Sequence, residues 1–347
     1  MVSLAAGHQL DGAGEAISTI ERTPKTVNLT SRIKLEHVAC NFCGSSTHRI
    51  WRRVSEWTAV ECQRCRFRFT NPRPTRDSLP AFYTEGYFQD ERHRLSHCDA
   101  NGSPLLDLPT GRYLNRVTDI EPWFEARGTL FEVGSARGAF LKVMRDRGWS
   151  VRGIDISADA AGFARNTYDV DVVSATPEEF GTSDRFNVVC MYQTLEHLPD
   201  PLHVLQKART WLQPGGVLVI EVPNANSFDI RISRRQANLT LDLPRHLSHF
   251  TPSFLCGQLE RLGFRVLCCK LYPPSPLVTL LQWHERARSR FSQPKLVCLP
   301  RPPAVPPLLP LARPPAETWK SRLIQRITSV APGWRFTVVA RTTALPP

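Results

Sequence analysis

The chain has 347 residues, of which 41% are hydrophobic and 22% are charged. This composition is typical of a folded globular protein, and the length indicates one large core with a smaller additional unit. No uncharged apolar run reaches the roughly 18 residues that a membrane-spanning helix needs. The N-terminal residues also lack the cationic start and apolar core of a signal peptide. The sequence therefore predicts a cytoplasmic protein without membrane insertion.

The net charge of +12 lies mostly near the C-terminus. Residues 284–347 contain eleven basic and two acidic side chains, a surplus of nine. This location favours a solvated basic surface, with a nucleic-acid-binding patch as the alternative. Residues 299–316 in the same region include eight prolines, which exclude a helix or a central strand and predict a loop or lid.

Two Cys-x-x-Cys pairs mark the first predicted unit, residues 38–70, which follows a polar segment, 1–37, that is predicted to be disordered. The pairs are separated by 18 residues and consist of Cys40, Cys43, Cys62 and Cys65. In a reducing compartment this spacing favours a bound metal over disulfides, and four thiolates can close a tetrahedral zinc site. Because such a site leaves no position open for catalysis, the prediction is a structural zinc ribbon.

A linker is predicted at 71–115, and short apolar runs then alternate with amphipathic stretches through the predicted core, 116–272. Buried strands are expected at 129–134, 150–155, 169–174, 186–191 and 216–223, with helices between them. This alternation predicts an α/β fold with a doubly wound parallel sheet. A helix at 252–263 and a strand at 265–272 follow. The extension 273–347 ends in GWRFTVVART, which is predicted to be a closing edge strand.

The first predicted strand runs into a glycine-containing turn, Gly134-Ser135-Ala136-Arg137-Gly138. Such a turn brings backbone N–H groups close to a ligand at a helix N-terminus, although a simple turn is the alternative. The next strand ends at Asp155, whose carboxylate could accept hydrogen bonds from both hydroxyls of a ribose. Together the two features predict a cofactor that contains a nucleoside.

The segment that follows resembles S-adenosylmethionine (SAM)-dependent methyltransferases. The matching residues are Asp184, Phe186, Leu195, Glu196, His197, Asp200, Pro201, Pro214, Gly215 and Gly216. The resemblance covers about residues 129–272 and implies a class I methyltransferase with a Rossmann-like sheet. It also implies a SAM site made of Glu132, Gly134, Ser135, Ala136, Gly138, Asp155, Ile156, Ala175, Thr176, Met191 and Gln193. Many members have a glycine where Ala136 stands, so weaker or reshaped cofactor binding is expected.

The ribbon and the linker after it, with Tyr83 and Tyr87, resemble bacterial zinc-ribbon methyltransferases of sugar and natural-product pathways. This resemblance implies that the ribbon helps to cover the substrate cleft and that the acceptor is a small molecule such as a sugar. Deoxysugar C-methyltransferases carry a Glu-His pair near the position of Arg245 and His246. Because an arginine replaces the glutamate, the C-methylation mechanism does not carry over, and Arg245 could instead hold an anionic acceptor.

His246 is predicted to be the general base, because a histidine can take up a proton near neutral pH; a structural role is the alternative. The second candidate is His197, next to Glu196. In quinone-pathway O-methyltransferases a similar Glu-x-x-Glu-His stretch has been linked to a divalent metal. Gln193 replaces the first acid here, which favours a role for the pair in ordering the cofactor side of the cleft.

Two other functions are compatible with the sequence. The basic C-terminal region and the ribbon could belong to an RNA methyltransferase, although no Asn-Pro-Pro-Tyr-type motif for base flipping follows the fourth strand. Alternatively, degeneration of the SAM loop at Ala136 would leave a methyltransferase-like protein that binds SAM without catalysis. The intact Asp155 and the Leu-Glu-His region argue against that second alternative.

Overall fold

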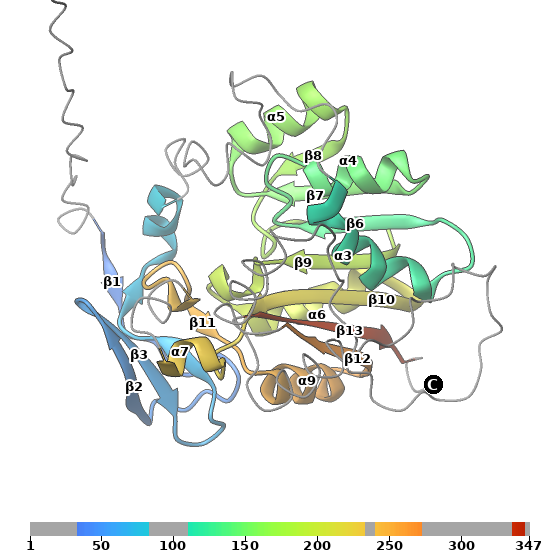
Figure 1. The fold of residues 1–347 in the computed structure, drawn as a ribbon. Helices are drawn as coiled ribbons and strands as arrows, with labels where there is room; N and C mark the ends of the chain where they lie inside the picture. Colours follow the sequence, from blue (N-terminus) through green and yellow to red (C-terminus); the bar gives the residue numbers. More distant parts are fainter. Residues whose placement is uncertain (1–32, 83–109, 233–239, 273–334, 344–347) are drawn as a thin grey trace, which may run out of the picture. The chain divides into compact units, whose positions relative to one another are not determined.

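The computed structural model describes residues 33–82, 110–232, 240–272 and 335–343. Its main feature is a seven-stranded sheet in the order β12-β13-β10-β9-β6-β7-β8 (Figure 1). The strands are β6 (Thr129–Val133), β7 (Ser150–Asp155), β8 (Asp171–Ser174), β9 (Phe186–Tyr192), β10 (Leu212–Pro223), β12 (Phe264–Leu271) and β13 (Arg335–Thr342). Strands β6 to β10 pair in parallel, whereas β13 is antiparallel to both of its neighbours. The predicted α/β class with a doubly wound sheet is confirmed.

The closing strand β13 differs from the prediction. It was expected at an edge, but it lies between β10 and β12, and Val339 pairs with Val219 on one side and Cys268 on the other. Its side chains are buried on both faces of the sheet, as a central position requires. An apolar run indicates that a strand is buried, but it does not indicate which strands lie on either side. The position of β13 in the sheet could therefore not be predicted from the sequence.

Hydrophobic layers cover both faces of this sheet because alternate residues of each strand point to opposite sides. Leu130 and Val188 belong to one buried cluster, while their neighbours Phe131 and Val189 belong to the other. The helices are α3 (Thr110–Ile120), α4 (Ala139–Asp146), α5 (Ala158–Tyr168), α6 (Pro201–Trp211), α7 (Phe228–Ile232) and α9 (Pro252–Arg261).

Side chains that accept hydrogen bonds from backbone N–H groups fix where three helices begin. Ser157 caps α5, Asp200 caps α6 and Thr251 caps α9. Helix α6 ends at Trp211, and β10 begins at once at Leu212 rather than at residue 216. Gly215, with a φ of +76°, lies in the irregular start of that strand.

A second sheet of four strands has the order β11-β4-β3-β2. It contains β2 (His48–Val54), β3 (Trp57–Cys62), β4 (Arg68–Thr70) and β11 (Ser248–His249). A short pair, β1 (Leu35–Glu36) with β5 (Arg73–Pro74), precedes the 3-10 helix η2 (Arg76–Phe82). Strand β11 lies within the predicted core, 116–272, but pairs with β4, so the cysteine-containing unit is hydrogen-bonded to the segment that carries His246 and His249.

Several predictions lie outside the described residues. These are the disorder of the N-terminal segment up to residue 32, the roles of Tyr83 and Tyr87, and the proline-rich stretch 299–316. Among the helices that the structure describes, none combines the length and apolar character needed to cross a membrane.

Candidate active site

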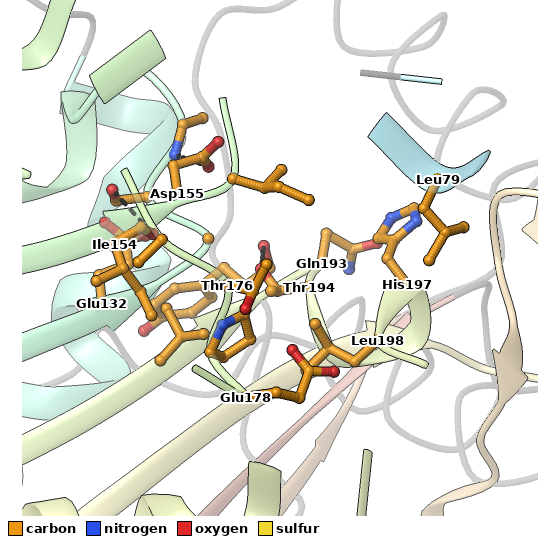
Figure 2. A pocket seen from close by; sticks show the side chains of 18 of the residues that line it. Leu79, Glu132, Ile154, Asp155, Thr176, Glu178, Gln193, Thr194, His197 and Leu198 are labelled. Carbon is orange, nitrogen blue, oxygen red and sulfur yellow. Dashed lines mark hydrogen bonds between the residues drawn. The ribbon is translucent and has the colours of Figure 1, made fainter. Parts of the chain in front are cut away.

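A cavity of about 520 Å³ lies where β6, β7 and β9 end and helix-linking loops begin. This edge of an open parallel sheet is where α/β proteins commonly bind ligands. Figure 2 shows Glu132 and Asp155 at one end of the cavity, Leu79 and His197 at the other, and Gln193 between them. The cavity therefore has an end next to the glycine turn and an end next to the Leu-Glu-His segment.

The glycine turn after β6 forms one wall of the cavity, to which Gly134, Ser135 and Ala136 contribute. At Gly134 the φ is +73°, and a Cβ would lie 2.4 Å from the hydroxyl oxygen of Thr194, so only glycine fits. Ala136 also has a left-handed φ of +48°. Gly138 does not line the cavity; a Cβ there would lie 2.8 Å from that of Ala164, so this glycine allows close packing of the turn against α5.

Asp155, at the end of β7, is buried and faces the cavity. Its two carboxylate oxygens accept hydrogen bonds from backbone N–H groups, Oδ1 from Ser157 at 2.9 Å and Oδ2 from Ala136 at 2.7 Å. Burial raises the pKa of Asp155, and these two hydrogen bonds oppose the shift. They also fix the orientation of the carboxylate, and each oxygen keeps a second lone pair for a ligand.

Glu132 and Arg116 form a pair of opposite charges on the same wall. The Arg116 guanidinium, from α3, lies 3.9 Å from Oε1 of Glu132 and 4.2 Å from the ring centre of Tyr192. Burial raises the pKa of Glu132 to about 7; Arg116 lowers it and Asp155 raises it further. No sequence motif points to Arg116, because α3 precedes the first recognisable motif.

The other predicted cofactor residues are divided between the cavity and the core. Ile156, Ala175, Thr176 and Gln193 line the cavity. Met191, which was expected to lie beside the sulfonium, does not line it and is fully buried in the core. The reason is that successive side chains of a strand point to opposite faces of the sheet. Met191 therefore shares a face with Val189, whereas Tyr192 points to the opposite face and lines the cavity.

Of the two candidate bases, His197 lines the cavity and His246 does not. The His197 ring donates from Nδ1 to the carbonyl of Arg245 at 3.1 Å, and the His246 ring donates from Nδ1 to the carbonyl of Thr240 at 3.0 Å. The ring centres are 4.7 Å apart. Burial lowers the pKa of each ring to about 3, which favours neutral imidazoles at pH 7.

Arg245 lies next to these histidines but does not line the cavity. Its guanidinium donates to Asp242 at 2.7 Å. The assignments of Arg245 as an acceptor-binding residue and of His246 as a base stay predictions.

The four predicted zinc ligands come together in one cluster. The Sγ atoms of Cys40 and Cys65 are 3.4 Å apart, those of Cys43 and Cys62 are 3.5 Å apart, and all four lie within 4.8 Å of one another. Zinc–sulfur bonds of 2.3 Å in a tetrahedron place sulfurs about 3.8 Å apart. The cluster therefore fits a zinc ion with little adjustment.

Hydrogen bonds connect the cysteine unit to both histidine segments. The Asn41 side chain and the Arg73 guanidinium donate to the carbonyl of Pro199 at 3.0 and 2.7 Å. The Thr70 backbone N–H donates to the carbonyl of Leu247 at 3.0 Å, and the N–H of Leu247 donates to the carbonyl of Glu196 at 2.8 Å. The loops at the His197 end of the cavity are thus held partly by the cysteine-containing unit.

Comparison with known proteins identifies the family. The model of a methyltransferase-domain family matches residues 85–268, more than half of the chain. The ubiquinone biosynthesis O-methyltransferase of Aeromonas salmonicida is 30% identical over 149 residues, which cover 40% of this chain and 63% of that protein. The enzyme of the same name from Pseudomonas paraeruginosa is 31% identical over 124 residues, 31% of this chain and 53% of that one. The matches thus span less than two thirds of these relatives.

A solved SAM-dependent methyltransferase from Archaeoglobus fulgidus is 19% identical and has a TM-score of 0.46, over 67% of this chain and 92% of that one. The family match, which includes β6, β7, β9 and most of the cavity wall, establishes the relationship. The chain belongs to the methyltransferase-domain family.

Proposed function

We propose that this protein transfers the methyl group of SAM to a small-molecule acceptor. The observation that carries the proposal is the buried Asp155 carboxylate, which two backbone N–H groups orient toward a cavity large enough for a nucleoside cofactor and part of an acceptor. Two hydroxyl groups on adjacent ribose carbons are donors that suit such a carboxylate. The methyltransferase-domain family match supports the same conclusion.

The rest of the cavity wall suits the two ends of SAM. The methionine end carries one ammonium and one carboxylate, and Glu132 and Arg116 offer the opposite charges side by side. At the other end, Ile156 exposes 39% of its surface and can pack against adenine, with Thr176 nearby on the cavity wall. The sulfonium methyl would then point toward Gln193 and His197.

The acceptor would enter beside His197, Leu198 and Leu79 of η2. In the transfer, an acceptor lone pair forms a bond to the methyl carbon as the carbon–sulfur bond breaks, and sulfur keeps the electron pair. Positioning of the two reactants supplies most of the acceleration. If the acceptor is a hydroxyl its proton must leave, and among the described residues His197 is the imidazole that lines the cavity. His246 could act only through His197.

We propose two alternative chemical classes for the acceptor. The relatives named as ubiquinone biosynthesis enzymes favour an aromatic hydroxyl. The resemblance of the ribbon to that of sugar-modifying methyltransferases favours a sugar. We further propose that the cysteine cluster holds a structural zinc ion, in keeping with its sulfur separations.

Calorimetry with SAM and S-adenosylhomocysteine tests the cofactor, and one site per chain is expected. Incubation with methyl-labelled SAM and separate pools of phenols, sugars and RNA then tests the acceptor. Folded protein that binds neither nucleoside would overturn the proposal. Label found only in RNA would replace the small-molecule acceptor with RNA, and binding without transfer in any pool would indicate a non-catalytic SAM-binding protein.

A further inference from the structure

A row of buried polar side chains crosses the seven-stranded sheet on the face that α3 covers. Tyr192 of β9 pairs with Glu221 of β10, which pairs with Thr337 of β13, which in turn pairs with Lys270 of β12. Because residues directly opposite on neighbouring strands share a face, the four side chains lie on one side of the sheet. Each residue exposes 4% or less of its surface. Polar groups buried this deeply need partners within the protein.

Helix α3 supplies a charged side chain at each end of this row. The Lys270 ammonium donates a hydrogen bond of 3.0 Å to Oδ1 of Asp119, and both residues are buried. At the other end, the Arg116 guanidinium lies 4.2 Å from the ring centre of Tyr192 and 3.9 Å from Oε1 of Glu132. Asp119 and Arg116 are three residues apart, so they lie on the same side of the helix. The Asp119–Lys270 ion pair thus connects β12 to the helix that carries Arg116.

The charges around α3 favour this one placement of the helix. Burial acts to lower the pKa of Arg116, but the negative charges of Glu221 and Glu132 outweigh it and raise the pKa above its usual value. Burial raises the pKa of Asp119 to about 6; Lys270 opposes this shift and Glu221 adds to it. A displacement of α3 that moved Asp119 toward Glu221 would bring like charges together and leave Lys270 without its partner. Loss of one partner from a buried ion pair is costly.

We propose that Asp119 and Lys270 are positioning residues for the cofactor, because their ion pair sets the register of α3 and so holds Arg116 beside Glu132. This inference rests on the proposed function, which assigns Arg116 and Glu132 to the methionine end of SAM. Neither Asp119 nor Lys270 lines the cavity, whereas Arg116 does. An effect of the ion pair on a ligand must therefore pass through Arg116.

Two ligands can separate this role from a general contribution to stability. S-adenosylhomocysteine carries the ammonium and carboxylate of the methionine end, and methylthioadenosine has the same nucleoside without these two groups. The proposed ribose residue, Asp155, is oriented by the backbone N–H groups of Ser157 and Ala136 and not by α3. Displacement of α3 should therefore weaken binding of S-adenosylhomocysteine alone, whereas a general loss of structure would weaken binding of both ligands.

The test is calorimetry of both ligands with the full-length protein and its variants. Lys270→Met, which removes the charge but keeps an unbranched side chain, should weaken S-adenosylhomocysteine binding by about 10- to 100-fold through the lost contact between charged groups. Affinity for methylthioadenosine should change by less than about twofold, since no charged contact of that ligand is lost. Arg265→Met, at an exposed position of the same strand, is the matched control and should bind both ligands like the wild type.

A double variant addresses the risk that Lys270→Met leaves Asp119 buried without a partner and does not fold. Asp119→Leu combined with Lys270→Met replaces the ion pair by apolar side chains, and such replacements are often neutral for stability. This variant should unfold at a urea concentration similar to that of the wild type and still show the selective loss of S-adenosylhomocysteine binding. Arg116→Gln should produce the same selective loss by itself and add little in the double variant, because residues that act through one contact are not additive.

The inference is overturned if the folded double variant keeps the wild-type ratio of the two affinities, or if both ligands lose affinity equally. Either result would leave the SAM proposal intact, since the wild type would still bind S-adenosylhomocysteine. Wild-type protein that binds neither ligand would overturn the proposed function and this inference with it.

Discussion

The hydroxyl of Thr70, in the last position of β4, donates a hydrogen bond of 2.6 Å to the backbone carbonyl of His246. Thr70 is fully buried, and its hydroxyl also lies 3.2 Å from Nε2 of His249. One side chain of the cysteine unit is thus hydrogen-bonded to the segment that carries His246. From this contact we predict that the cysteine-containing unit positions the His246 segment, in addition to any role in binding zinc.

We predict that Thr70→Val lowers kcat/KM for the acceptor by about 10-fold, because the loss of one buried hydrogen bond corresponds to roughly 1–1.5 kcal/mol. SAM affinity should change less than twofold, since Thr70 does not line the cavity. Steady-state kinetics and calorimetry measure the two effects separately. Thr70→Ser should restore activity, and the exposed Thr210→Val serves as the control. Equal losses of SAM affinity and of turnover would indicate general destabilisation instead.

Asp155→Asn is predicted to weaken SAM binding by about 5- to 150-fold. The variant keeps the size of the side chain but replaces a charged acceptor, and a hydrogen bond to a charged group is worth roughly 1–3 kcal/mol. Calorimetry measures the affinity. Asp159→Asn, an exposed position in α5, is the matched control. Unchanged affinity in a folded Asp155→Asn variant would show that the ribose is held elsewhere.

Glu132 should make the free energy of unfolding depend on pH. Burial raises its pKa to about 7 from an ordinary value of 4.5, so the folded protein holds a proton that the unfolded chain releases between these values. The contribution of Glu132 to the free energy of unfolding is fully present below pH 4.5 and is lost as the pH rises through 7. The loss amounts to up to about 3 kcal/mol.

Urea unfolding at pH 5 and pH 8 compares the wild type with Glu132→Gln, which cannot titrate. The wild type should lose more stability over this interval than the variant. Parallel pH profiles for the two proteins would contradict the assignment.

Cys62→Ser is predicted to remove the zinc of the cysteine cluster and to reduce acceptor turnover far more than SAM affinity. The reason is that β3 ends at Cys62 and pairs with β4, which carries Thr70. Elemental analysis and thiol titration measure the metal, and Cys256→Ser, outside the cluster, is the control. Purified wild-type protein with neither zinc nor iron, and with fully titratable native thiols, would rule out the metal site.

Ala136→Gly is predicted to raise the free energy of unfolding slightly, by up to about 1.5 kcal/mol. Alanine at a φ of +48° has a left-handed backbone, which costs roughly 1–2 kcal/mol, while glycine adds about 0.5–1 kcal/mol of entropy cost on folding. SAM affinity should rise or stay equal, because the N–H that donates to Asp155 remains. Thermal unfolding checks the first effect. Ala158→Gly, in the first turn of α5, should destabilise the protein, and a similar loss for Ala136→Gly would contradict the strain argument.

The parts of the protein that depend on local spacing could be predicted from the sequence. The two cysteine pairs each close a short turn, so their register follows from neighbouring residues; Gly44 and Arg66, directly after the pairs, share a left-handed φ near +70°. The glycine turn and Asp155 belong to consecutive strands of a parallel sheet, whose carboxyl ends lie at one edge. The alternation of apolar and amphipathic stretches was therefore enough to predict the fold class, and the glycine turn and Asp155 were predicted to lie at the same edge of the sheet.

Only the tertiary structure decided which distant segments meet. Arg116 reaches the cavity because α3 packs beside β10 of the sheet. His246 lies next to His197, in the segment where β11 pairs with β4. The strand order likewise gives β13 its central position, and the register of β9 places the Met191 side chain in the core instead of the cavity. These features depend on contacts between residues far apart in sequence, which a local pattern of burial does not encode.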